Sequence, residues 1–518
     1  MSLNFFDFNC MLGPTNTNRE PSFLSARQLL AEMDRLGIAE AMVYSSLARY
    51  AHPSDGNALL LEEIRHHPRL HACWIGLPPG TGEMPEPAAF VQQMQQQNVR
   101  ALRLLPEAHR YPLLEESLYP LLHELNAAKI PLLIDIDRAN WGEIKLDWRE
   151  IFTIAGAHPD LPLVLLREGG STARVLFSVW EKYPNIRLDA SYIQESRIIE
   201  EIVTRFGPDK LIFGSAMPRF DAGGPLASVM GASVEEKDKA AIAGNNARRL
   251  LQLPENPQQT SSHWPCGQNG FRVFDTHGHI GRWDLKYYPD WTPAQMVERM
   301  DQLGIERFAV SDILAIGPDF RSGNDRIGQA VAQFPDRLVG YAAYNPNYES
   351  QMADEMARCF DELGLSGIKL HCALHDTATV DRSYRLAFQT AHERKCPMLC
   401  HVQLNPSPEF FKSILADYPD CQFIYAHIGG TNQQTLQPFL EVAYERSNFF
   451  IELSASVMQR GVLAWLTQNA PGEQILFGSD HPLNEFSFQL GRVLYAEIND
   501  DIKQKILWDN AARIFNIT

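Results

Sequence analysis

The chain contains two copies of one sequence pattern, and this duplication restricts the fold more than any other feature. Residues 274–281 read FDTHGHIG, and residues 6–13 read FDFNCMLG. Four further pairs of segments follow in the same order: GIKLH (367–371) with ALRLL (101–105), KCPMLCHV (395–402) with KIPLLIDI (129–136), AHIGG (426–430) with LREGG (166–170), and ILFGSDHP (475–482) with LIFGSAMP (211–218). The 518 residues therefore form two related halves.

Both halves alternate short apolar runs with amphipathic stretches. The runs are 3–9, 39–45, 70–77, 99–105, 130–136, 161–167, 185–191 and 210–215 in the first half, and 273–277, 306–312, 338–345, 367–372, 397–402, 423–428, 449–454 and 475–480 in the second. Eight strands that alternate with helices predict a parallel sheet closed into a barrel, for which about 250 residues is typical. We predict an α/β fold of two tandem TIM (β/α)8 barrels, the second of which binds a metal.

The predicted domain borders follow from composition. Residues 254–270 read PENPQQTSSHWPCGQNG, which is rich in Pro, Gln, Ser and Gly and is typical of a linker. We therefore assign residues 1–253 to the first barrel, 254–270 to the linker and 271–518 to the second barrel.

Charge and cysteine content restrict the class of protein. The net charge of −17 argues against nucleic acid or a membrane surface as a partner. No apolar stretch reaches the roughly 20 residues that span a bilayer, and no basic region precedes an apolar run at the N-terminus. The eight cysteines show no disulfide framework, so a reducing, cytoplasmic location is expected.

The two copies share their framework residues but differ at six polar positions. These are His277 against Asn9, His279 against Met11, Lys369 against Arg103, His401 against Asp135, His427 against Arg167, and Asp480 against Ala216. A purely structural residue should be needed equally in both copies. The six residues of the second half are all metal-ligand types, which predicts a metal site there and none in the first half.

The predicted positions of these residues support the metal site. His277 and His279 are two residues apart on a strand, so their rings leave the same face. All six lie at or near the carboxyl ends of predicted strands, where barrel enzymes build their sites. A single histidine in an apolar strand is more often a hydrogen-bonded core residue, and Asp480 alone could cap a helix. Ligand types on five strands favour the metal, with zinc preferred over iron or manganese.

These motifs resemble the amidohydrolase superfamily, in particular the amidohydrolase-related branch that includes aminocarboxymuconate-semialdehyde decarboxylase. The resemblance covers the second half at all its motifs and the first half as a degenerate copy. It implies that His277, His279, His401 and Asp480 hold one zinc ion. It also implies that His427 acts as an acid/base beside the metal, while Asp480 both binds the metal and accepts a proton.

The sequence is compatible with two roles for Lys369. In superfamily members with two metals, a lysine on strand four is carboxylated and bridges them, and a buried lysine shifts its pKa readily. In the decarboxylase-like branch one metal is usual, and Lys369 would then bind a substrate carboxylate or pair with an acid. We favour one metal per chain over two.

Residues that contact the substrate are harder to assign from sequence. Arg282 and Trp283 follow the first strand of the second half, and His371 follows the fourth, so we expect these three, with Lys369, at the pocket. Loop packing is the alternative for each. Arg282 and Lys369 together indicate a small molecule with an anionic group.

The resulting hypothesis is a metal-dependent hydrolase. It would cleave a small carboxylated ester, lactone or amide with a zinc-bound hydroxide, because zinc lowers the pKa of water to about 7. The alternative is non-oxidative decarboxylation at the same site, which would make the chain a carbon–carbon lyase. A third hypothesis is a binding or regulatory protein without turnover, which the intact ligand set opposes.

We predict that the first half is noncatalytic. Arg103, Asp135 and Arg167 occupy neighbouring strands and are expected to form an ion cluster in place of the metal, since buried charges persist when paired. A separate anion-binding pocket is the alternative. Because related barrels often dimerise, the two halves are expected to imitate a dimer within one chain.

Overall fold

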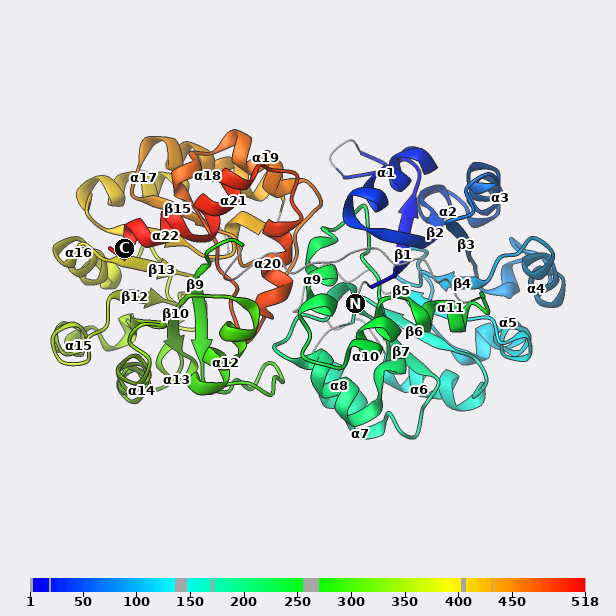
Figure 1. Cartoon of the computed structure of the whole chain (residues 1–518), viewed down its shortest axis with the longest axis horizontal. Helices are drawn as coiled ribbons and strands as arrows, with labels where there is room; N and C mark the ends of the chain where they lie inside the picture. The colour runs from blue at the N-terminus through cyan, green and yellow to red at the C-terminus, as the bar shows by residue number, and fades with distance from the viewer. Residues whose placement is uncertain are drawn as a thin grey trace. The chain divides into compact units, whose positions relative to one another are not determined.

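Two parallel sheets of eight strands each organise the chain (Figure 1). The computed structural model describes residues 3–17, 20–135, 147–168, 172–254, 270–401, 407–430 and 432–517. The chain divides into two compact units, Met1–His263 and Trp264–Thr518, each with one sheet. Only the end residues of the predicted linker, Pro254 and Gly270, belong to the described residues.

The strands follow the predicted order in both units. The first sheet contains β1 (Phe5–Leu12), β2 (Ile38–Ser45), β3 (Leu70–Ile75), β4 (Ala101–Leu104), β5 (Leu132–Asp135), β6 (Leu163–Leu166), β7 (Ile186–Asp189) and β8 (Leu211–Ile212). The second contains β9 (Phe274–Ile280), β10 (Arg307–Asp312), β11 (Leu338–Ala343), β12 (Gly367–Leu370), β13 (Pro397–Cys400), β14 (Gln422–Tyr425), β15 (Phe449–Glu452) and β16 (Ile475–Leu476).

Each sheet closes on itself. In the first unit Phe8 N–H donates to the Phe213 carbonyl at 2.9 Å, which joins β1 to the segment after β8. In the second unit Thr276 N–H donates to the Phe477 carbonyl at 3.0 Å. Closure and sequential parallel order confirm two tandem TIM barrels.

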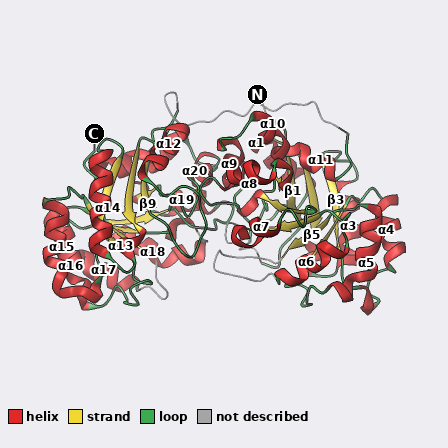
Figure 2. Ribbon diagram, turned by 90° about the horizontal axis from the view of Figure 1, so that it is seen from below, coloured by secondary structure: helices red, strands yellow, loops and turns green. Residues whose placement is uncertain are grey.

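Helices surround the strands in each unit (Figure 2). Those of the first are α1 (Ala26–Leu36), α2 (Ser46–Tyr50), α3 (Pro53–Ile64), α4 (Pro87–Gln96), α5 (Glu115–Ala128), α6 (Trp148–Ala157), α7 (Ala173–Val179), α8 (Ile198–Phe206), α9 (Gly223–Gly231), α10 (Glu236–Ala240) and α11 (Asn246–Leu250). Those of the second are α12 (Pro293–Leu303), α13 (Ile313–Ile316), α14 (Phe320–Gln333), α15 (Glu349–Asp361), α16 (Arg385–Arg394), α17 (Pro408–Asp417), α18 (Gln433–Glu445), α19 (Val462–Asn469), α20 (Phe486–Leu494), α21 (Asp500–Gln504) and α22 (Asn510–Ile514).

Local sequence explains helix α12 well. Thr292 caps its N-terminus in a capping box with Gln295, and Pro293 occupies the first turn, where its missing N–H has no cost. Gly304 ends the helix in the left-handed conformation with φ of 74°. Met296, Met300 and Leu303 form the buried stripe that packs into the core.

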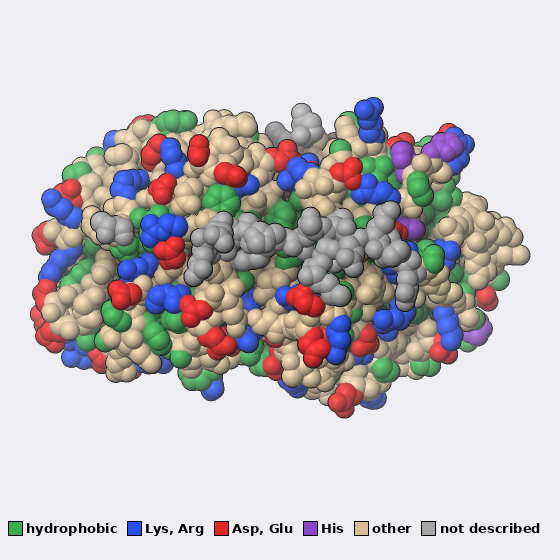
Figure 3. Space-filling view, in the orientation of Figure 1, with side chains coloured by type: hydrophobic (Ala, Val, Ile, Leu, Met, Phe, Trp, Pro, Cys, Tyr) green, Lys and Arg blue, Asp and Glu red, His purple; other side chains and the backbone are tan. Residues whose placement is uncertain are grey.

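The surface is charged and mixed. On the face drawn in Figure 3, acidic and basic side chains are interspersed in both units. Such interspersed charge is usual for a solvated surface. Among the described residues, no helix is both long and apolar enough to cross a bilayer. The seven described cysteines are buried free thiols.

The two units also share unusual backbone conformations. His427 and Asp480 adopt left-handed φ angles of 67° and 65°, and their counterparts Arg167 and Ala216 adopt 58° and 60°. Non-glycine residues occupy this region rarely. The duplication therefore extends to the backbone around the candidate site, although the side chains there have changed.

Candidate metal centre

The six residues singled out by the sequence comparison lie at the carboxyl end of the second barrel. His277 and His279 belong to β9, and Lys369 belongs to β12. The apolar runs predicted that His401, His427 and Asp480 lie within strands. In the structure they follow the ends of β13, β14 and β16 instead. The difference arises because the chain turns away at these points, with a positive φ at His427 and Asp480.

Asp480 lies against both histidines of β9. Its Oδ1 is 3.2 Å from His279 Nε2 and 3.5 Å from His277 Nε2. Lys369 Nζ lies 2.9 Å from the same His277 Nε2. Lys369 is fully buried, so it lies among the candidate ligands rather than at an exposed pocket rim.

The other two histidines contact each other. His427 Nε2 lies 3.0 Å from His401 Nδ1, and the His277 and His427 rings are 4.8 Å apart between centroids. His427 Nδ1 lies 3.0 Å from the carbonyl oxygen of Ser454, which only accepts hydrogen bonds. The proton of neutral His427 therefore resides on Nδ1, and Nε2 is its basic atom.

The histidines have partners behind the site. Ser311 Oγ is 2.9 Å from His279 Nδ1, and Glu452 Oε2 is 3.4 Å from His277 Nδ1. Ser454 Oγ is 3.1 Å from the same nitrogen of His277. Such contacts orient an imidazole and leave its other nitrogen for a metal.

Burial controls the charge of the site. Burial lowers the pKa of His277, His279 and His401 well below the usual value, and nearby Lys369 lowers it further. Burial likewise lowers the pKa of His427, against the effect of Asp480. The imidazoles are therefore neutral, which is the state in which they bind metals.

The two charged groups respond to burial in opposite ways. Burial lowers the pKa of Lys369 to about 8, although Asp480 and other groups oppose the shift. Burial raises the pKa of Asp480, and the strongest opposing influence is His427, followed by Lys369 and Lys286. A bound cation would favour the ionised carboxylate, because opposite charge stabilises it.

The donor set fits a transition metal. Neutral imidazoles and one carboxylate suit zinc, manganese or iron. Among the described residues, one ligand atom from each of His277, His427 and Asp480 lies within 4.8 Å of the others. His279 and His401 adjoin this group through the contacts given above, so the arrangement accommodates His427 either as a ligand or as a base.

The predicted substrate-binding residues occupy different environments. The exposed Arg282 places its guanidinium 4.2 Å from the ring centroid of Trp291. Trp283 is half-buried against an apolar cluster that includes Ile313 and Ala343. His371 is buried and stacks on His401, with centroids 4.0 Å apart, so it supports a candidate ligand directly.

The corresponding site of the first barrel holds an ion cluster. Arg103 forms an ion pair with Asp135 and donates to Asn9 Oδ1 at 2.9 Å. Arg49 is 3.7 Å from Asp135, although the sequence comparison did not single out this arginine. Arg167 lies over the ring of Phe220, 3.6 Å from its centroid, and burial lowers its pKa to about 10.

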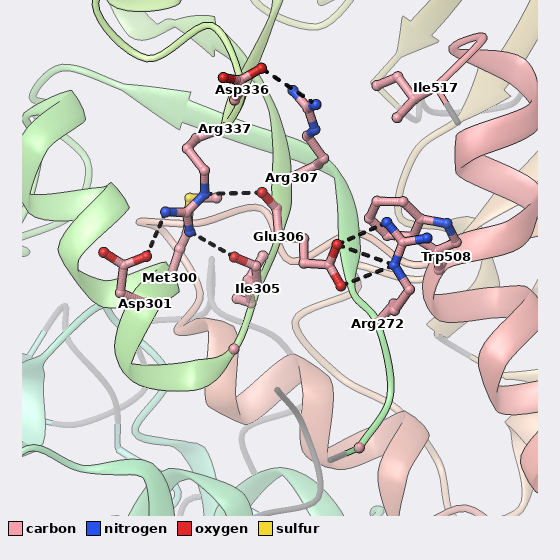
Figure 4. Close-up of a pocket in the computed structure, with 12 residues that line it drawn as sticks. Arg272, Met300, Asp301, Ile305, Glu306, Arg307, Asp336, Arg337, Trp508 and Ile517 are labelled. Atoms are coloured by element: carbon pink, nitrogen blue, oxygen red, sulfur yellow. Dashed lines mark hydrogen bonds and ion pairs between the residues drawn. The ribbon is translucent and has the colours of Figure 1, made fainter. Parts of the chain in front are cut away.

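A separate hollow of about 560 Å³ lies at the opposite end of the second barrel, near the starts of β10 and β11 (Figure 4). Arg337 donates to Asp301 at 2.5 Å and to the carbonyls of Ile305 and Glu306. Arg69 of the first barrel makes the corresponding bonds to Asp34 at 2.6 Å, Ile38 and Ala39. Since both copies keep this arrangement, we interpret it as scaffold.

The sequence comparison missed Glu452, Ser454 and Ser311. Glu452 ends β15, as Asp189 ends β7, so an acid stands there in both copies and a search for differences discards it. Ser311 has Tyr44 as its counterpart, and this change could have revealed it.

The model of the amidohydrolase family (Amidohydro_2) matches residues 13–253 and, separately, residues 274–517. The chain belongs to the amidohydrolase family. Both barrels of this amidohydrolase are thus recognised individually, and the chain is a metal-dependent hydrolase or decarboxylase. No curated protein matches it.

The amidohydrolase is also similar to solved structures. One is 5-carboxyvanillate decarboxylase from Sphingomonas paucimobilis, with 17% identity, a TM-score of 0.39, and coverage of 48% of this chain and 100% of that chain. Another is dihydroxybenzoic acid decarboxylase from Polaromonas sp. JS666 with bound manganese, with 18% identity, a TM-score of 0.39, and coverage of 48% and 97%. A third is 4-oxalomesaconate hydratase from Rhodopseudomonas palustris, with 17% identity, a TM-score of 0.36, and coverage of 47% and 95%.

Proposed function

We propose that the second barrel hydrolyses a small carboxylated ester, lactone or amide with the help of one divalent metal ion. The observation that carries this proposal is the state of His427. Its Nδ1 proton is held by the Ser454 carbonyl, and its basic Nε2 lies among the candidate ligands. A neutral histidine with its lone pair on Nε2 is in the state that takes a proton from water, whereas protonation of a carbon atom would first require a proton on Nε2.

His277, His279, His401 and Asp480 would hold the metal. When bound, a divalent metal acts as a Lewis acid and lowers the pKa of water, which supplies a nucleophile at neutral pH. His427 would remove the proton from the attacking water at Nε2 and return it to the leaving group. Asp480 is an additional proton acceptor in the same group.

Lys369 would bind a carboxylate of the substrate when it is protonated. Its ammonium group is buried 2.9 Å from His277, so an anionic substrate group would have to enter the centre of the site. With a pKa of about 8, the amine is partly neutral just above that pH, which also suits carboxylation and a second metal. Metal stoichiometry separates these two roles.

The first barrel would be a noncatalytic partner. Arg103, Asp135 and Arg167 replace three of the candidate ligand positions, and Ala216 replaces the carboxylate. The ion pair between Arg103 and Asp135 occupies the position that holds histidine and lysine in the second copy. We interpret it as a structural substitute for the metal.

The proposal is tested by product analysis. Zinc- or manganese-loaded protein is screened against carboxylated lactones, esters, amides and unsaturated acids. The mass change from substrate to product is measured by mass spectrometry. Addition of one water supports hydrolysis. Loss of carbon dioxide would replace it with decarboxylation, and absence of bound metal in the purified and reloaded protein would overturn both.

The substrate anchor has its own test. We expect Arg282→Met to raise KM for a carboxylated substrate much more than for its neutral ester, because the exposed guanidinium would pair with the carboxylate. Arg272→Met serves as a comparison, since Arg272 lies at the opposite end of the barrel and pairs with Glu306 at 2.9 Å. An equal change in KM for both substrates would remove Arg282 from the binding site.

A further inference from the structure

Glu452 is a buried carboxylate at the carboxyl end of β15, directly behind the candidate metal ligands. We propose that Glu452 is a positioning residue, which acts through Ser454 to fix the tautomer of His277 and holds the backbone of His427 in its left-handed turn. The inference rests on the proposed function, because it concerns how the same metal centre is held.

The first step concerns the hydroxyl proton of Ser454. Ser454 Oγ donates to Glu452 Oε2 at 2.8 Å, so its single proton is committed to the carboxylate. The lone pairs of Oγ then face His277 Nδ1 at 3.1 Å and His427 Nδ1 at 3.0 Å. A hydroxyl whose proton is used elsewhere can only accept, so both histidines must carry their protons on Nδ1.

The second step follows for the opposite ring nitrogens. With Nδ1 protonated, Nε2 of each neutral ring is the atom with a free lone pair. His277 Nε2 faces Lys369 and Asp480, and His427 Nε2 faces His401. The Ser454 hydroxyl, which Glu452 orients, fixes the lone pair of His277, and the Ser454 carbonyl fixes that of His427. Two nitrogen lone pairs thus face the site, as a metal ligand and a general base require.

The third step concerns the backbone. His427 N–H donates to Glu452 Oε2 at 2.8 Å, and Ser454 N–H donates to Oε1 at 2.8 Å. The first bond holds His427 at a φ of 67°, which costs free energy in a non-glycine residue unless its surroundings fix it. Glu452 therefore ties the end of β15 to the turn that carries the proposed base.

The first barrel provides an internal comparison. Asp189 stands at the position of Glu452, and its Oδ1 accepts from Arg167 N–H at 2.6 Å. Its Oδ2 accepts from Asn9 Nδ2 at 2.9 Å, where Asn9 stands at the position of His277. The contacts to strand one and to the turn after strand six are present in both copies. In the second copy these contacts hold imidazole rings.

The glycine beside this carboxylate is also shared. A Cβ at Gly478 would lie 2.0 Å from Glu452 Oε1 and 2.9 Å from His277 Cβ. A Cβ at Gly214 of the first barrel would lie 2.7 Å from Asp189 Oδ2. Only glycine leaves room for the carboxylate to reach its partners.

The test compares Glu452→Gln with the wild-type full-length protein, without any substrate. We expect zinc affinity, measured by chelator competition, to fall about 10–100-fold, as is typical when a partner behind a ligand is removed. In metal-free protein, ¹⁵N-histidine NMR should show Nδ1–H tautomers for His277 and His427 in the wild type. In Glu452→Gln we expect a mixture at His277, whereas the Ser454 carbonyl keeps the proton of His427 on Nδ1. Asp189→Asn is the matched control in the first barrel and should change neither readout.

Two further variants cover the case in which Glu452→Gln does not fold. Ser454→Ala removes the bridging hydroxyl while Glu452 keeps its bonds from the backbone N–H groups of His427 and Ser454. Gly478→Ala displaces the carboxylate, with Gly214→Ala as its control. Either should weaken zinc binding and mix the tautomers of His277. Wild-type affinity and unchanged tautomers in these variants would overturn the positioning role of Glu452, whereas a wild-type protein that binds no zinc would overturn the proposed function instead.

Discussion

We expect individual side chains to decide which half of the chain can hold a metal. His277 and His279 leave one face of β9 and both lie within 3.5 Å of Asp480 Oδ1. We expect purified protein to carry about one transition metal per chain, or about two if Lys369 is carboxylated. The double variant His277→Ala/His279→Ala should carry none by elemental analysis, and retention of the metal would show that the ligands lie elsewhere.

His427 is expected to behave differently from His401. If His427 is the base, His427→Asn should keep most of the bound metal while the rate falls by about 10²–10⁴, the usual effect of losing a positioned acid/base. His401→Ala should lose the metal. Equal metal loss in both variants would make His427 a ligand, in agreement with its short distances to His277 and Asp480.

A buried histidine outside the ligand group makes stability depend on pH. Burial lowers the pKa of His375 to about 4, and its Nε2–H donates to the Ile316 carbonyl at 3.1 Å. In the unfolded chain the pKa is about 6.5, so below pH 6.5 the unfolded state binds a proton that the folded state refuses. This contribution to stability is complete above pH 6.5 and is lost as the pH falls toward 4.

We expect His375→Gln to lose less unfolding free energy than the wild type between pH 6.5 and 4, by up to about 3 kcal/mol. Gln keeps a donor for the Ile316 carbonyl. Urea melts at several pH values measure the difference, with the exposed His66→Gln as control. Parallel curves for His375→Gln and the wild type would contradict the assignment.

The limits of sequence reasoning at the residue scale are visible at Glu452. The comparison of the two copies revealed His277 and Asp480 because their counterparts are Asn9 and Ala216. It could not reveal Glu452, because the counterpart Asp189 is also acidic. Both carboxylates accept a hydrogen bond from the backbone N–H after strand six, so both copies need an acid at this position. A comparison of two related copies reveals the positions that differ and gives no sign of functional positions that have the same residue type in both.

At the scale of elements, strand order and strand number were predictable, but strand ends were not. The apolar run 475–480 predicts a strand to Asp480, whereas β16 ends at Leu476. The run reflects burial, which continues through Phe477 into the turn. The pattern of apolar residues indicates burial but does not indicate a positive φ angle. The turn that places Asp480 in the site could therefore not be predicted from the sequence.

A buried ion pair connects helix α12 to the residue before helix α20 in the second barrel. Arg299 of α12 donates to Glu485, the residue before α20, at 2.8 Å, and both side chains are buried. We expect Arg299→Leu to destabilise the second barrel by about 3–5 kcal/mol in urea melts, because it leaves a buried carboxylate without this partner. Arg299→Leu/Glu485→Leu should recover much of the loss, and a double variant as unstable as the single one would show that the charge is not the cause.

At the scale of the whole molecule, the duplication predicts a supporting role for the first barrel. Residues 271–518 expressed alone should aggregate or self-associate if the fused copy takes the place of the second subunit of a dimer. Size-exclusion chromatography with light scattering measures this. A soluble, monomeric and fully active fragment would rule out the supporting role.

The left-handed backbone at Arg167 and Ala216 has a practical consequence for protein engineering. These positions keep the torsion angles of His427 and Asp480 although neither side chain binds a metal. A designer who wished to install a second metal centre would therefore find the backbone at these two positions already bent as a ligand requires. Exchange of the six differing side chains, with Asp189→Glu and Tyr44→Ser, is the set of substitutions to try.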